Sequence, residues 1–392
     1  MVYKNTFIIK IVNHLSFIEV LKVYNYLLKN KFVNHEGERM FGERLIRARK
    51  TAGLSLRALA DSVGVSQTAI NKYEKGILIP DSTMLMKLAK VLEVKAGYFL
   101  RSNSLELEKP EYRKKSTLSK KKLQQIEGKI LDKIERRLEL EALFPKSPVP
   151  EFTPPSDLPR TIQSMEDIEE IANKVRHAWD LGLNPISELV DVLESIGIRV
   201  FEIEEGADSK FDGLAATVNG YRIIVISKAW SGDRQRFTMA HELGHLILEG
   251  KLSNDIDEER ASDRFAGAFL LPNSALQSEL GEHRTRLELR ELLLLKQEFG
   301  ISMAGILYRA RNLGIIREGY HKSLIIEFSK RGWRKNEPER YPAEEPHHFQ
   351  QLIFHALAED YISESKAAEL MNMSQAAFYQ MRMLEDKDAA IH

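Results

Sequence analysis

A proline-rich segment near the middle of the chain limits how its parts can fold together. Residues 144–160, FPKSPVPEFTPPSDLPR, hold six of the chain's 13 prolines. Each proline fixes its φ angle and lacks a backbone N–H, so the segment cannot continue a helix or lie inside a sheet. We therefore expect a stiff linker between separately folded parts. A chain of 392 residues is long enough for two or three domains.

Charge and residue pattern predict five blocks along the chain. They are an N-terminal extension (1–39), a domain of short helices (40–101), a charged helix with the linker (102–160), a second large domain (161–316) and a helical tail (317–392). The charged helix has apolar residues at helical spacing: Leu123, Ile126, Ile130, Ile134 and Leu138. We expect it to pack against the domain that follows, since it has too few clean heptads for a coiled coil.

The N-terminal extension raises a question about where translation begins. The sequence HEGER directly precedes Met40, and its Glu, Gly and Arg can be written with purine-rich codons that suit a ribosome-binding sequence. We hypothesise that Met40, rather than Met1, is the natural start. A real helical extension over residues 1–39 is the alternative.

Overall composition excludes several classes of protein. The chain has 57 lysine and arginine residues and 57 aspartate and glutamate residues, so its formal net charge is zero. No overall electrostatic field therefore favours binding to nucleic acid or to a membrane. There are no cysteines, so a disulfide framework is excluded and any zinc site must use histidine and carboxylate ligands. Charged residues interrupt the N-terminal apolar stretch too often for a membrane span or a signal peptide. We expect a cytoplasmic protein with no membrane partner.

The second block has the pattern of a compact all-α domain. Ser55 and Ser66 each precede a helical pattern and suit helix N-caps. Gly64 stands where the intervening turn needs a positive φ. From Met40 to Arg101 there are eleven basic and five acidic residues, a surplus of six positive charges. Such a local field is what binding to DNA phosphates requires.

This block resembles the helix-turn-helix of the phage-repressor or XRE family, through GLSLRALADSVGVSQTAINKYEKG. The resemblance implies that the third helix lies in the major groove of a double-stranded DNA operator. It places four residues against base edges or phosphates: Gln67, Thr68, Asn71 and Lys72. Where the family usually carries a phosphate-contacting Gln, this chain has Leu56. Binding of protein alone by this fold is the alternative.

The second large domain has the pattern of an α+β fold with a small antiparallel sheet. PISELVDVLESIG, opened by Asn184-Pro185, predicts a helix, and IRVFEI predicts a strand. GLAATV and YRIIVIS predict two strands joined by Asn219-Gly220, a strong hairpin signal. A core helix from Ser231 or Asp233 to Gly250 follows.

That helix carries the sequence HELGH. His241 and His245 are one turn apart on one face, so both imidazoles can bind one metal ion. Glu242 is offset by one residue and can act as general base on a water at that ion. Downstream, EERASDRFAGAFLLP predicts a second helix, whose Glu259 completes a His₂Glu set that leaves one position open. Asp263 can orient one ligand histidine, and Glu258 is the alternative ligand.

These two segments, RFTMAHELGHLILEG and EERASDRFAGAFLLP, resemble the ImmA/IrrE metallopeptidase family. The family implies a zincin-like fold, a Zn²⁺ cofactor and an endopeptidase that cleaves a regulatory protein. It assigns the ligand roles to His241, His245 and Glu259 and the base role to Glu242. Ser262 stands where the family more often has Ala.

The sequence therefore predicts a multidomain transcriptional regulator that carries a zinc endopeptidase domain and a helical C-terminal region. Its expected partners are a DNA operator, a protein substrate such as a repressor or toxin, and a second copy in a homodimer. The alternative is a non-proteolytic repressor or antitoxin in which the zinc domain senses a ligand or partner. Polar candidates for stabilising an oxyanion are Arg234, Arg236 and Tyr308. The scattered histidines 177, 283, 321, 347, 348 and 355 are expected to be surface or packing residues.

Overall fold

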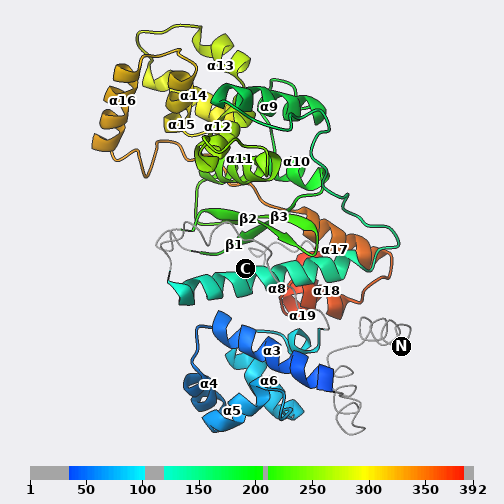
Figure 1. Cartoon of the computed structure of the whole chain (residues 1–392). Helices are drawn as coiled ribbons and strands as arrows, with labels where there is room; N and C mark the ends of the chain where they lie inside the picture. Colours follow the sequence, from blue (N-terminus) through cyan, green and yellow to red (C-terminus); the bar gives the residue numbers. More distant parts are fainter. Residues whose placement is uncertain (1–34, 102–118, 206–210, 384–392) are drawn as a thin grey trace, which may run out of the picture. The chain divides into compact units, whose positions relative to one another are not determined.

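The computed structural model describes residues 35–101, 119–205 and 211–383, which form two compact units. Residues 35–101, 119–148 and 347–383 lie in unit 1, and residues 149–205 and 211–346 lie in unit 2. Unit 2 is thus inserted, in sequence, between two parts of unit 1 (Figure 1). Residues 1–34 lie outside the described residues, and Met40 lies within the first described helix. The functional boundaries and the start site stay predictions.

Unit 1 contains the predicted domain of short helices. It comprises α3 (His35–Thr51), α4 (Leu56–Val63), α5 (Gln67–Glu74), α6 (Ser82–Val91) and the 3₁₀ helix η1 (Ala96–Leu100). The Ser55 hydroxyl accepts the Ala58 N–H, and the Ser66 hydroxyl accepts the Ala69 N–H. Gly64 ends α4 with φ +77°. The predicted caps and turn are confirmed.

The rest of unit 1 is α8 (Lys120–Glu141), α17 (His348–Ala358), α18 (Glu364–Leu370) and α19 (Gln375–Arg382). The expectation that the charged helix packs on the following domain is wrong, because α8 lies in unit 1 against α3, α17 and α18. Its fully buried residues Ile126, Ile130 and Ile134 form the apolar face. At Gly128 an added Cβ would lie 1.7 Å from Thr51 Oγ1, so α3 and α8 are in very close contact.

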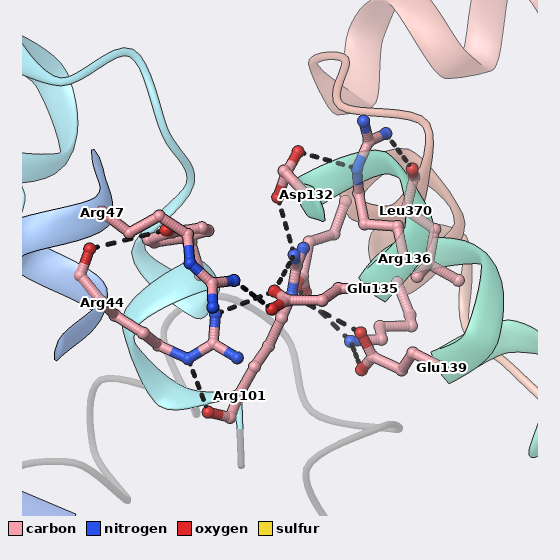
Figure 2. A network of polar contacts seen from close by, with 11 residues as sticks. Arg44, Arg47, Arg101, Asp132, Glu135, Arg136, Glu139 and Leu370 are labelled. Atoms are coloured by element: carbon pink, nitrogen blue, oxygen red, sulfur yellow. Dashed lines mark hydrogen bonds and ion pairs between the residues drawn. The ribbon is translucent and has the colours of Figure 1, made fainter. Parts of the chain in front are cut away.

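A buried ionic network reinforces this packing (Figure 2). The Glu135 carboxylate of α8 accepts hydrogen bonds from Arg44 at 2.9 Å and from Arg47 at 2.5 Å. The side chains of Arg44 and Glu135 are each 3% exposed. Arg101, just after η1, binds Asp132 of α8 at 2.8 Å. Arg136 donates to the Leu370 carbonyl of α18 at 2.6 Å. Removing a single member would leave buried charge uncompensated, so the network favours this packing of α8 on α3.

Unit 2 begins with α9 (Met165–Ala178) and α10 (Leu189–Ser195), followed by β1 (Arg199–Ile203), β2 (Gly213–Val218) and β3 (Tyr221–Ser227). The β2–β3 hairpin is antiparallel, and its turn has positive φ at Asn219 and Gly220, as predicted. However, β1 pairs parallel with β3, in the order β1-β3-β2. The sheet is therefore mixed, which corrects the expected antiparallel sheet. Periodicity identifies a strand, but only long-range pairing decides its direction.

The predicted start of α10 at Pro185 is also wrong. α10 begins at Leu189, and the distant Glu344 accepts the Val190 backbone N–H at 2.6 Å. Glu344 also pairs with Arg236, whose side chain is fully buried. Burial raises the pKa of Glu344 above its ordinary value, and Arg236 opposes that rise. No local signal near Pro185 could reveal a cap that comes from so far along the chain.

The centre of unit 2 is formed by α11 (Gly232–Leu248) and α12 (Glu258–Leu270), which pack closely together and, with α9, make the main core. The remaining helices are α13 (Asn273–Leu280), α14 (Leu289–Phe299), α15 (Met303–Asn312) and α16 (Glu318–Lys330). α16 packs on α15 in unit 2, whereas α17 to α19 belong to unit 1. The helical tail predicted over residues 317–392 is therefore divided between the two units. None of the described helices is long and apolar enough to span a bilayer.

The proline-rich segment contains no helix or strand, as predicted, since residues 144–160 form only turns and irregular backbone. Its second half packs on unit 2. A Cβ at Gly197, whose φ is +95°, would lie 2.4 Å from the Pro150 carbonyl oxygen. Phe152 packs against the main core of that unit.

Two further helix pairs repeat the turn of the α4–α5 pair. Gly300 precedes α15 with φ +63°, and Asn372 precedes α19 with φ +56°. Ser302 and Ser374 cap these helices, as Ser66 caps α5. Segments 299–314 and 361–381 therefore share the positive-φ turn and serine cap of the α4–α5 pair.

Candidate metal centre and nucleic-acid interface

The candidate metal centre lies between α11 and α12. α11 carries His241, Glu242 and His245, and α12 begins immediately before Glu259. Asp257 caps α12 by accepting the Arg260 N–H at 2.9 Å, which fixes where the helix starts. The local signals that set this start therefore also set the position of Glu259.

Three donor groups converge there: ligand atoms of His241, His245 and Glu259 all lie within 4.8 Å of one another. The two Nε2 atoms are 3.1 Å apart. Glu259 places one oxygen 3.5 Å from His241 Nε2 and the other 3.2 Å from His245 Nε2. The structure thus brings together the three residues expected as ligands.

A second pair of carboxylates contacts the far side of each imidazole. Asp263 lies 2.8 Å from His241 Nδ1, and Glu258 lies 3.2 Å from His245 Nδ1. A carboxylate can accept a hydrogen bond only from a ring nitrogen that carries a proton. These contacts therefore favour the tautomer of each histidine that has its proton on Nδ1. Both Nε2 lone pairs then face the same point. Glu258 lies on the Nδ1 side of His245, whereas Glu259 lies on the Nε2 side.

This donor set fits zinc. A tetrahedral ion with bonds of about 2.0–2.1 Å places its ligand atoms about 3.3 Å apart. The three observed separations, 3.1, 3.2 and 3.5 Å, bracket that value. Two lone pairs and a carboxylate at such short range repel one another unless a cation or protons lie between them. Histidine nitrogen and carboxylate oxygen are both ordinary zinc ligands.

Glu242 is buried, with 8% of its surface exposed, next to the first of these histidines. His241 and Glu259 are more open, with side chains 17% and 34% exposed. The donor groups are therefore unequally exposed: His241 and Glu259 are partly open to solvent, whereas His245 is buried, as is Glu242.

Close packing of the two helices positions these groups. Gly244, between the two histidines, faces α12, and an added Cβ would lie 3.1 Å from Ser262 Cα and 3.3 Å from Phe265 Cδ1. Ser262 is fully buried, and its hydroxyl has no hydrogen-bond partner in the described part of the chain. Two small residues thus allow α12 to approach α11. The glycine inside HELGH is the sequence signal for this close approach, because a larger residue there would contact α12.

The three candidates for oxyanion stabilisation, Arg234, Arg236 and Tyr308, have different surroundings in the structure. The Arg236 side chain is fully buried and paired with Glu344. Arg234 is exposed, binds Asp212 at 2.6 Å and lies over the Trp230 ring at 3.5 Å. Tyr308 contacts the ring of His321. Arg236 is thereby committed to a structural role, and neither other residue is linked to the metal centre by any contact described.

The candidate nucleic-acid interface is the outer face of α5. Gln67, Thr68 and Lys72 are exposed and Asn71 is partly exposed, while Ile70 and Tyr73 on the opposite face are buried. This polar face is what a recognition helix presents to a groove. The equivalent positions of α15 include buried Met303 and Leu307, so that helix has no comparable polar face.

These features are typical of a helix-turn-helix domain and a peptidase-type domain in one chain, and two family models match the same two parts of the sequence. Residues 45–99 match a family model described as helix-turn-helix, and residues 193–311 match a peptidase family model described as the IrrE N-terminal-like domain. Both resemblances seen in the sequence are confirmed, and the chain carries both domains.

Two curated relatives are similar over a shorter stretch. The SPbeta prophage-derived uncharacterized HTH-type transcriptional regulator YonR of Bacillus subtilis (strain 168) is 35% identical over 69 residues, which are 18% of this chain and 64% of the relative. The uncharacterized HTH-type transcriptional regulator YqaE of the same organism is 34% identical over 67 residues, 17% of this chain and 58% of the relative. The matches thus span about three fifths of these relatives, which are named as transcriptional regulators.

Proposed function

We propose that this protein is a cytoplasmic, DNA-binding transcriptional regulator whose metal domain is a zinc-dependent endopeptidase that cleaves a regulatory protein. The observation that carries the proposal is the convergence of His241, His245 and Glu259 within 4.8 Å, beside the buried Glu242. The family match over residues 193–311 supports the same reading.

In this proposal His241, His245 and Glu259 hold the ion. Asp263 and Glu258 keep both histidines in the tautomer that directs Nε2 inward. A bound zinc ion supplies a Lewis acid that polarises a peptide carbonyl and lowers the pKa of water. Glu242 accepts the proton of the attacking water and returns it to the leaving amine.

The helix-turn-helix would bring this activity to an operator, with Gln67, Thr68, Asn71 and Lys72 of α5 against bases and phosphates. The exposed polar face of α5 supports this role. The cleaved protein would be a repressor or toxin, and the regulator would bind a paired operator as a homodimer.

The test compares wild type with Glu242→Gln and His245→Ala in cleavage of candidate repressors encoded near the gene. We expect wild type and Glu242→Gln to bind one zinc ion per chain, and only wild type to cleave. Equal cleavage by Glu242→Gln would exclude this mechanism. Zinc binding and DNA binding without cleavage of any candidate would instead favour the non-proteolytic alternative, in which the domain senses a ligand or partner.

A further inference from the structure

The start of α8 carries a group of positive charges that the helix-turn-helix match, residues 45–99, does not include. Its first turn begins with Lys120, Lys121 and Lys122 and contains no acidic residue. Lys120 and Lys121 are exposed, and within the described part of the chain neither has an ion-pair partner. We call Lys120 and Lys121 the α8 lysine pair.

Lys121 of the α8 lysine pair lies beside the turn that leads into α4, and Lys120 is its neighbour in the first turn of α8. That turn contains Gly53, with φ +70°. A Cβ added at Gly53 would lie 3.2 Å from Lys121 Cε and 2.5 Å from Gln125 Nε2. The Lys121 side chain therefore reaches the backbone immediately before Ser55, the N-cap of α4.

This end of α4 is where a docked helix-turn-helix meets the DNA backbone. With the second helix of the motif in the major groove, the first helix crosses the phosphates. In this chain the first residue of that helix is Leu56, which has no polar group to offer a phosphate. Positive charge at the same place would supply what Leu56 lacks.

Two further positive side chains belong to the helices on either side of this turn. Lys50 is exposed near the end of α3, and Arg57 in the first turn of α4 has a side chain 83% exposed. The nearest acidic contact of Arg57 is Asp61 at 3.9 Å on the solvent-exposed helix surface, which neutralises it weakly. The α8 lysine pair thus adds to the exposed positive charges of Lys50 and Arg57, which lie before and after the α3–α4 turn in the sequence.

The position of the pair is structurally fixed. α8 contacts α3 at Gly128 and is joined to it by the buried ion pairs of Glu135 with Arg44 and Arg47 (Figure 2). A rigid helix holds its first turn in one place, so a contact made by these lysines loses little conformational freedom beyond that of their side chains.

We propose that the α8 lysine pair is a second DNA-binding site, which contacts the phosphate backbone beside the N-terminus of α4. The ligand is double-stranded DNA, recognised through charge and not through sequence. The proposal rests on the proposed function only in requiring that α5 docks in the major groove. In this proposal α8 contributes directly to DNA binding, together with the helix-turn-helix.

The experiment uses the full chain and a random-sequence duplex of about 40 base pairs, long enough for several turns of about 10 base pairs. Binding is measured from roughly 50 to 200 mM salt. The variants are Lys120→Ala/Lys121→Ala, Lys72→Ala, and a control, Lys322→Ala/Lys330→Ala on α16, which removes the same formal charge. Thermal melting verifies that each variant folds.

Loss of two phosphate contacts should lower the slope of log K against log salt by about 1.8 and weaken binding at least about tenfold near 0.1 M salt. The sequence preference selected from a random library should not change, and the control should match wild type. If the pair variant behaves like the control while Lys72→Ala lowers the slope, the role of α8 is refuted and the docking of α5 stands. If wild type binds no duplex, both proposals fail.

Discussion

Glu258 lies 3.2 Å from Nδ1 of His245, on the opposite side of the ring from Glu259, which lies 3.2 Å from Nε2. The two carboxylates are neighbours in sequence, at the start of one helix. One imidazole therefore separates an ion-facing carboxylate from an orienting one. This arrangement supports the proposal that Glu259 is the ligand and that Glu258 orients His245.

We expect Glu258→Ala to weaken zinc binding by about tenfold to a hundredfold, because the His245 ring loses the partner that fixes its tautomer and orientation. Competition with a coloured chelator would measure this. Asp255→Asn, a change at an exposed carboxylate in the preceding loop, is the control. If Glu258→Ala abolished binding as completely as His245→Ala, Glu258 itself would be the ligand.

Gly244→Ala should move α12 away from α11, since the new methyl group would lie 3.1 Å from Ser262 Cα. We expect a loss of about 1–3 kcal/mol in the free energy of unfolding and weaker zinc binding, because overpacking displaces Glu259. Ser262→Ala is the matched change across the same contact. It removes a buried hydroxyl without a described partner, so it should leave stability equal or slightly raised. A stable Gly244→Ala with normal zinc affinity would contradict the packing argument.

Glu135→Ala should strongly destabilise unit 1, because it leaves Arg44 buried without its carboxylate. A cost of about 3–5 kcal/mol is typical when one partner of a buried pair is removed. Chemical denaturation followed by circular dichroism would measure it. Glu43→Ala removes a carboxylate from an exposed pair with Arg39 and should cost less than about 1 kcal/mol. Equal effects of the two changes would argue against the buried network.

Stability should fall in strong alkali because of Tyr98. Burial raises the pKa of Tyr98 from 10.0 to about 12. The folded state then holds the phenolic proton more tightly than the unfolded state does. The resulting stability is fully present below about pH 10 and is lost as the pH rises toward about 12. Tyr98→Phe should remove this loss, about 2–3 kcal/mol, when unfolding curves at the two pH values are compared with wild type. Tyr308→Phe, at a half-exposed ring, should not.

Much of this architecture follows from local patterns. The helix-turn-helix was predictable because Ser55, Gly64 and Ser66 act within a few residues of their own positions. His241 and His245 were predictable as a pair because residues four apart on a helix always share a face. Glu344 was not predictable, because its cap on α10 and its pairing with Arg236 join segments more than a hundred residues apart.

The sequence by itself determined the two helices of the metal centre, the residue types available to an ion and the exposed polar face of α5, since each depends on helical periodicity and nearby caps. Tertiary structure decided what those helices meet. It turned Glu258 and Glu259 to opposite sides of His245, made the sheet mixed and placed α8 beside the helix-turn-helix. Each of these outcomes depends on packing and buried charge between segments that are far apart in the sequence. Such contacts produce no periodic pattern of residues, so they cannot be read from the sequence alone.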